Sequence, residues 1–110
     1  MAYDEDLADR IRALIAVEDV VEKRMFGGLA FLVGGHMAVA ASGQGGLMVR
    51  TEPEETDALL AEPHAQPFEM RGRPMQGWLR VAAEGVRTEA ELAPWVQRGV
   101  AYARSLPPKG

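Results

Sequence analysis

Near the middle of the chain the sequence runs Leu29-Ala30-Phe31-Leu32-Val33-Gly34-Gly35-His36-Met37-Ala38-Val39-Ala40-Ala41. Two apolar runs flank a pair of glycines, and this pattern predicts a β-hairpin because the tight primed turns need positive φ angles. A glycine-rich turn at residues 42–46 leads to a third predicted strand at residues 47–50. Its residues alternate, with Leu47 and Val49 on one face, so we expect an antiparallel meander with one covered side.

The N-terminal part predicts a helix followed by an extended segment. Over residues 4–18, apolar side chains recur at helical spacing on one face, and acidic residues occupy the first turn, where the helix dipole favours negative charge. This stripe consists of Leu7, Ile11, Leu14 and Ile15. Residues 20–26 are expected to be an extended lead-in to the meander that ends at Gly27-Gly28.

The C-terminal part predicts two further helices and two strands. Thr51 with Glu54, and Thr88 with Glu91, have the spacing of a capping box, so each pair is expected to open a helix. The first helix is short and ends near residue 63, and the second runs toward residue 106. Strands are expected at residues 68–70 and 77–83, joined by a turn at 71–74. Pro94 implies either a kink in the last helix or a start near residue 93.

The resulting order is α-β-β-β-α-β-β-α, an α+β fold with an antiparallel sheet of about five strands and helices packed on it. A chain of 110 residues is typical of one domain, so we expect a single domain over residues 1–110. The sequence has no cysteine, no signal-peptide pattern and no long apolar run. We therefore expect a soluble cytoplasmic protein that does not contact membranes.

One stretch resembles a known family. Residues 25–38 open with Met25-Phe26-Gly27-Gly28 and continue into the predicted hairpin, as in the N-terminal domain of the TfoX/Sxy family. The later segments at residues 47–50, 67–70 and 95–103 agree in order. The best-known members are bacterial regulators of natural competence that carry a second, helical domain. The resemblance implies a regulatory protein of the TfoX N-terminal type, and it carries over no catalytic residue.

Nothing in the residue pattern indicates catalysis. The two serines, Ser42 and Ser105, and the two histidines, His36 and His64, fall in predicted turns, loops or helix ends. A nucleophile needs a base held beside it, and a metal needs ligands at a defined spacing. We expect no enzymatic activity, no catalytic residue, no cofactor and no metal site.

Two groups of residues are candidates for binding a partner. Glycines at the start of a strand indicate a bulge or a close backbone approach, to the chain itself or to a ligand, so the first group is Met25, Phe26, Gly27 and Gly28. The second group is Arg50, Arg71, Arg73 and Arg80, which would form an anion-binding patch if they converge and are otherwise solvated surface residues.

These candidates lead to two hypotheses about function. The first is a small regulatory or adaptor module that binds a protein partner, with self-association as one form of it. The alternative is a nucleic-acid-binding or transcription-related regulator that uses the arginines. The net charge of −4 disfavours general nucleic-acid binding.

Overall fold

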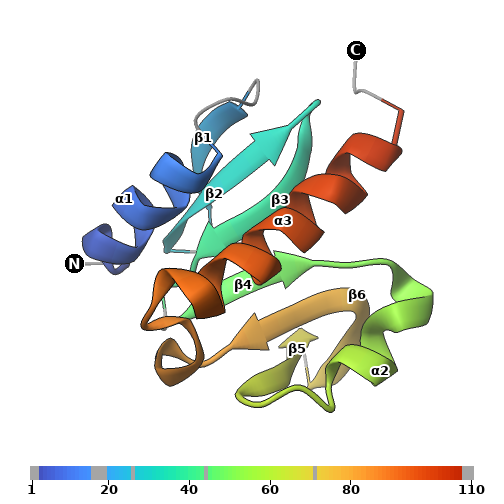
Figure 1. The fold of residues 1–110 in the computed structure, drawn as a ribbon. Coiled ribbons are helices and arrows are strands. Elements are labelled where there is room, and N and C mark those ends of the chain that lie inside the picture. The colour runs from blue at the N-terminus through green and yellow to red at the C-terminus, as the bar shows by residue number, and fades with distance from the viewer. Residues whose placement is uncertain (1–2, 16–19, 26, 44, 71, 108–110) are drawn as a thin grey trace.

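A single antiparallel sheet of six strands organises the residues that the computed structural model describes, which are 3–15, 20–25, 27–43, 45–70 and 72–107 (Figure 1). In spatial order its strands run β1-β2-β3-β4-β6-β5. Their bounds are β1 Val20–Met25, β2 Gly28–Val33, β3 His36–Ala41, β4 Leu47–Arg50, β5 Ala65–Met70 and β6 Arg73–Val81. The helices are α1 Glu5–Leu14, α2 Thr56–Leu59 and α3 Glu89–Ser105, with short 3-10 turns at Pro53–Glu55 and Ala83–Val86. The predicted α+β class is confirmed.

The central hairpin forms as the sequence predicts. Gly34 and Gly35 have φ angles of 61° and 84°, and Val33 pairs with His36 across the two-residue turn. Both glycines therefore adopt the left-handed conformation that a primed turn requires.

The sheet has one strand more than expected, because residues 20–25 pair with β2 over their whole length as strand β1. The four inner residues of β1 are all exposed, so this edge strand does not show the alternation of apolar and polar residues that identifies a half-buried strand. The observed order of helices and strands is α-β-β-β-β-α-β-β-α.

Both long helices begin where their capping residues predict. The Asp4 carboxylate accepts hydrogen bonds from the backbone N–H groups of Asp6 and Leu7 at the start of α1. Thr88 and Glu91 form the full capping box of α3, so this helix begins at Glu89 and continues through Pro94. Residues 16–18, the end of the predicted first helix, lie outside the described residues.

The capping box predicted at Thr51 is wrong. Thr51 is fully buried, and its backbone N–H donates to the Gly77 carbonyl of β6 at 2.8 Å. It therefore remains tied to the sheet, and the following 3-10 turn begins after Glu52 without a side-chain cap. Arg73, expected in a turn, is the first residue of β6.

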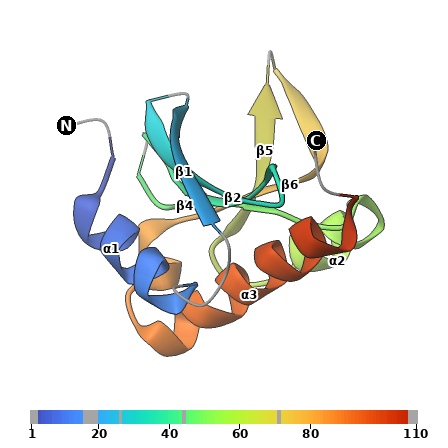
Figure 2. The same ribbon diagram turned by 90° about the horizontal axis from the view of Figure 1, so that it is seen from above.

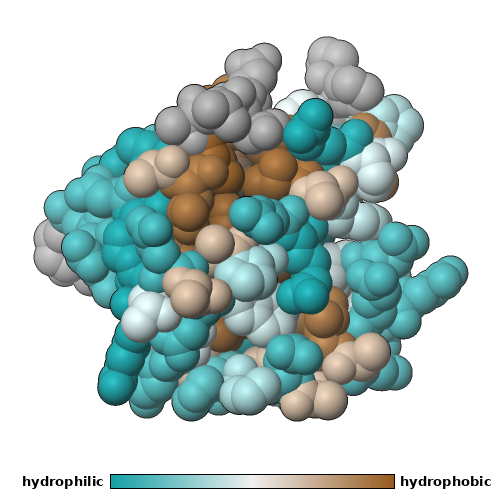
Figure 3. Space-filling view, viewed as in Figure 1, coloured by the Kyte–Doolittle hydropathy of each residue, from teal (hydrophilic) through white to brown (hydrophobic). Residues whose placement is uncertain are grey.

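The main core lies between one face of the sheet and the helices. Figure 2 shows α1, α2 and α3 on the same side of the sheet, and Figure 3 shows hydrophobic side chains gathered between α1 and α3 on that side. The contact of α3 with β3 is close: a Cβ atom on Gly99 would lie 2.4 Å from the Ala38 carbonyl oxygen. No helix of the described residues packs on the opposite face of the sheet, which we call the open face.

Candidate functional site

The open face carries its own apolar cluster, separate from the core under the helices. Its buried members are Ala30, Met37, Ala40 and Met48, and the partly buried side chains packed on them are Met25, Leu32, Phe68 and Trp78. A two-layer α+β fold protects one face of its sheet with helices, so apolar residues on the other face need a different explanation. The curvature of the sheet explains part of this burial. Strands β1 and β2 at one end, and β5 and β6 at the other, rise away from the helices, so the open face is concave (Figure 2).

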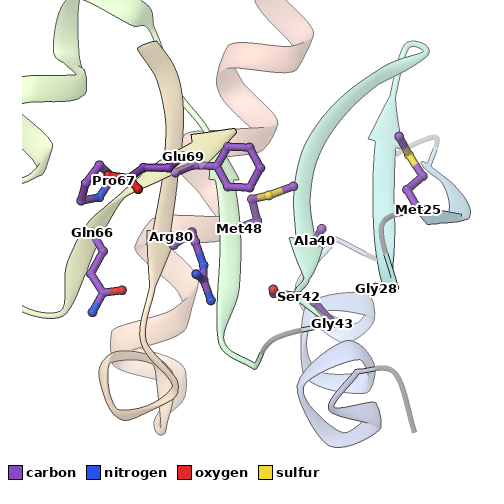
Figure 4. A pocket seen from close by; sticks show the side chains of 12 residues that line it. Met25, Gly28, Ala40, Ser42, Gly43, Met48, Gln66, Pro67, Glu69 and Arg80 are labelled. Carbon is purple, nitrogen blue, oxygen red and sulfur yellow. The ribbon is translucent and has the colours of Figure 1, made fainter. Parts of the chain in front are cut away.

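A groove with a volume of about 670 Å³ lies within this concave face. Figure 4 shows Met25 on one side of the groove, Gln66 and Pro67 on the other, and Met48 and Arg80 between them. The lining residues are Met25, Gly28, Ala40, Ala41, Ser42, Gly43, Met48, Gln66, Pro67, Phe68, Glu69 and Arg80. This volume lies in the range of binding sites in proteins, and the groove combines apolar side chains with the polar residues Gln66, Glu69 and Arg80.

The strand register shows which charged residues share the open face. Residues directly opposite in an antiparallel pair have their side chains on the same face. One row across the sheet therefore consists of Lys23, Ala30, Ala40, Met48, Arg80 and Gln66. Arg50 lies two residues beyond Met48 and pairs with Trp78, which places it on the same face. Glu22 and Arg24 alternate with Lys23 and lie on the helix side.

Aromatic side chains hold Arg50 in place. Its guanidinium carbon lies 5.2 Å from the centre of the Trp78 ring and 5.5 Å from that of Tyr102 on α3. The Trp78 ring in turn lies 6.3 Å from Phe68, centre to centre. These distances are typical of cation–π and aromatic pairs. Arg50 is therefore partly engaged within the protein.

The first predicted group of binding residues falls partly at the groove. Met25 and Gly28 line it, whereas Gly27 is exposed in the β1–β2 turn with a φ angle of 77°. Phe26 lies outside the described residues. At Gly28 the structure contains a close backbone approach within the chain, since a Cβ atom there would lie 2.3 Å from the Ala41 carbonyl oxygen.

The predicted arginine group is spread over the sheet. Arg50 and Arg80 lie on the open face of the neighbouring strands β4 and β6. Arg73 begins β6, seven residues from Arg80, which corresponds to about 23 Å along an extended strand. Arg71 lies outside the described residues. Of the three candidate arginines that the structure describes, it places Arg50 and Arg80 together on the open face.

Several groove residues were not singled out as binding residues from the sequence. Phe68 and Met48 lie on β5 and β4, and they meet at one face only because β6 lies between these strands. For Met48 the sequence does contain a signal, because the alternation of residues 47–50 places it on the side opposite Leu47 and Val49. For Lys23, which lies on the open face but does not line the groove, the sequence held no such indication, since β1 was not expected to pair as a strand.

The remaining polar features lie outside the groove. Arg12 of α1 donates to both Glu22 carboxylate oxygens, at 2.5 and 2.8 Å, and also pairs with Asp9. The hydrogen bond from Arg12 holds the pKa of the Glu22 carboxyl below its ordinary value. His36 Nε2 lies 2.7 Å from the Pro107 carbonyl oxygen. In the described part of the chain no three His, Asp or Glu side chains are placed to hold a metal ion, and no helix there has the length and apolar character needed to cross a membrane.

Comparison with known proteins identifies a family. The sequence model of the TfoX N-terminal domain matches residues 12–103, which include every strand and all of the groove-lining residues. The curated proteins contain no match to the chain.

Proposed function

Since this chain belongs to the TfoX N-terminal domain family, we propose that it is a non-enzymatic regulatory or adaptor module that binds a protein partner on the open face of its sheet. The cytoplasmic location expected from the sequence is part of the same proposal. The observation that supports it is the groove of the open face, where Met25, Met48 and Phe68 line a concave surface that no helix of the described residues covers.

Burial of this surface would supply the binding free energy. Removing apolar area from water is favourable by roughly 25 cal/mol per Å². Two side chains of this face, Phe68 and Trp78, are aromatic, and such residues are enriched among those that dominate interfaces. Methionine side chains adapt their shape to a partner because they are unbranched and flexible.

This function is tested by affinity purification from lysate of the source cells, with and without nuclease. The wild-type protein and variants of the groove are each used as bait. Met25→Glu places a charge at the groove wall, and Phe68→Ala removes an aromatic ring from it. Ala90→Glu is the matched control, because this exposed residue lies on the helix side in the first turn of α3, where a negative charge is tolerated.

We expect a protein partner that survives nuclease and is retained by the Ala90→Glu protein, but is lost with Met25→Glu and Phe68→Ala. A partner retained by all variants would place the interaction elsewhere and contradict the proposal. Circular dichroism and Tm of each variant show whether the fold is kept.

Nucleic acid is the second candidate occupant of this face. Arg50 and Arg80 lie there together with the rings of Phe68 and Trp78, and single-stranded nucleic acids bind to surfaces that combine cations with stacking rings. Recovery of nucleic acid from the untreated sample alone, with affinity that falls steeply as salt rises, would support this candidate instead.

A further inference from the structure

We propose that the open face binds an amphipathic helix of a protein partner, with apolar residues facing the groove and Asp or Glu beside them. This inference rests on the proposed function and names the chemistry of the partner. It combines three properties of the face: its backbone is already paired, its floor is apolar and adaptable, and its cations outnumber its carboxylates.

The paired backbone selects a helix over an extended segment. Across the groove, β2, β3, β4 and β6 are hydrogen-bonded to one another, so their N–H and C=O groups are not available to a ligand on the face. An extended peptide lying there would bury backbone groups without partners, which is costly. A helix satisfies its own backbone groups and presents only side chains, as in other helix-in-groove complexes.

The shape of the face agrees with this occupant. A helix with its side chains is about 10–12 Å wide, and the sheet curves upward at both ends into a trough (Figure 2). The groove of about 670 Å³ between Met25 and Pro67 can receive one or two large apolar side chains from such a helix. Met48 and Phe68 would surround them.

The charges on the face select an acidic helix. Three cations, Lys23, Arg50 and Arg80, lie at paired strand positions of the open face, although the whole chain has a net charge of −4. The Arg50 guanidinium is already held by two aromatic rings. In the described residues no carboxylate forms an ion pair with Lys23 or Arg80. Glu69 also lines the groove, from an exposed position next to Phe68. A carboxylate from the partner would form a charge-assisted hydrogen bond with Arg80.

A displayed library of helical peptides tests the inference directly. Each peptide has about five turns, with Leu, Met or Phe at the i, i+3, i+4 and i+7 positions of one face and either Glu or Lys at the flanking positions. The full chain is the bait, and the affinities of selected peptides are measured by fluorescence anisotropy at two salt concentrations. A single-stranded oligonucleotide serves as a second probe.

We expect the selected peptides to carry Glu, and the versions with Lys to bind at least about tenfold more weakly. Arg80→Glu should weaken the Glu-bearing peptide at least about tenfold and improve the Lys-bearing one. The neighbouring pair Lys23 and Arg24 provides a matched control, because both are exposed and their side chains point to opposite faces. Lys23→Glu should weaken binding several-fold, and Arg24→Glu should leave it unchanged.

The contrary results are equally definite. Any one of four results would overturn the acidic-helix inference. These are selection without a preference for Glu, equal effects of Lys23→Glu and Arg24→Glu, binding of the oligonucleotide in place of the peptides, and no selected peptide at all. The proposed function fails separately, if the natural partner from lysate is unaffected by Met25→Glu and Phe68→Ala. A partner that depends on the groove while the library shows no acidic preference would keep the proposed function and reject the acidic-helix inference.

Discussion

Replacing Gly28 by alanine should destabilise the fold because there is no room for a Cβ atom at this position. Such an atom would lie 2.3 Å from the Ala41 carbonyl oxygen and 3.0 Å from the Gly43 nitrogen. Both are backbone atoms, and real Cβ contacts are essentially never shorter than 3.0 Å, so β2 and β3 must separate by at least 0.7 Å at this end.

The cost follows from what this separation disrupts. Leu29 pairs with Ala41 next to the clash, so one or two strand hydrogen bonds weaken, each with a net value of about 1 kcal/mol. Strain from overpacking adds about 1–3 kcal/mol. We expect Gly28→Ala to lower the free energy of unfolding by about 2–5 kcal/mol, which corresponds to a fall in Tm of roughly 10 °C or more.

Urea denaturation at equilibrium measures this loss, with Gly27→Ala as the control. Gly27 has a φ angle of 77° but no atom within 4 Å of a Cβ placed there, so alanine meets only backbone strain of about 1–2 kcal/mol. A Gly28→Ala protein that is as stable as the wild type but no longer binds its partner would refute this reasoning. That result would show that the glycine is needed for contact with a ligand.

Three further substitutions test other contacts. Thr56→Val should lower the free energy of unfolding by about 1–3 kcal/mol in urea denaturation, because the buried Thr56 hydroxyl accepts the Gly77 N–H at 2.8 Å and valine leaves this donor unpaired. Thr56→Ser keeps the hydroxyl and should therefore lose much less. Thr88→Ala should cost about 1 kcal/mol by removing the capping box of α3, whereas Thr88→Ser should be nearly neutral, and equal losses in the two variants would contradict the capping role. Glu22→Gln should lower stability at neutral pH and have no effect in acid. The pKa of Glu22 is lower in the folded chain, so its pairing with Arg12 stabilises the fold fully above the unfolded-state pKa. This contribution is lost as the pH falls through the folded-state pKa, which lies below the ordinary 4.5. A stability difference between the two proteins that persists in acid would exclude this cause.

The features that depend on neighbouring residues could be predicted from the sequence. The Gly34-Gly35 hairpin, the α3 capping box and the alternation in β4 all follow from a few adjacent residues. The same local pattern failed at Thr51, where a contact with Gly77 of β6 holds the residue in the sheet. The side chain of Thr51 is fully buried, so a long-range contact overrides its capping preference.

Strand β1 shows a second limit of local patterns. An edge strand has a neighbour on one side only, and in β1 the residues from Val21 to Arg24 are exposed on both faces. Alternation arises from burial of one face, so a strand that buries neither face shows no periodicity, and the pairing of β1 with β2 becomes visible only in the structure.

The candidate site depends on strand order, which local sequence patterns do not contain. Arg73 and Arg80 belong to the same strand, but they lie about 23 Å apart along it, so sharing a strand does not bring them together. Lys23 and Arg80, from opposite ends of the chain, lie in one row because β4 pairs with β6 and not with β5. Positive charge on the open face is therefore a property of the register. A substitution that shifts the register of β6 against β4 by one residue would turn Arg80 toward the helices and Leu79 toward the groove, and would remove the cation without changing the composition.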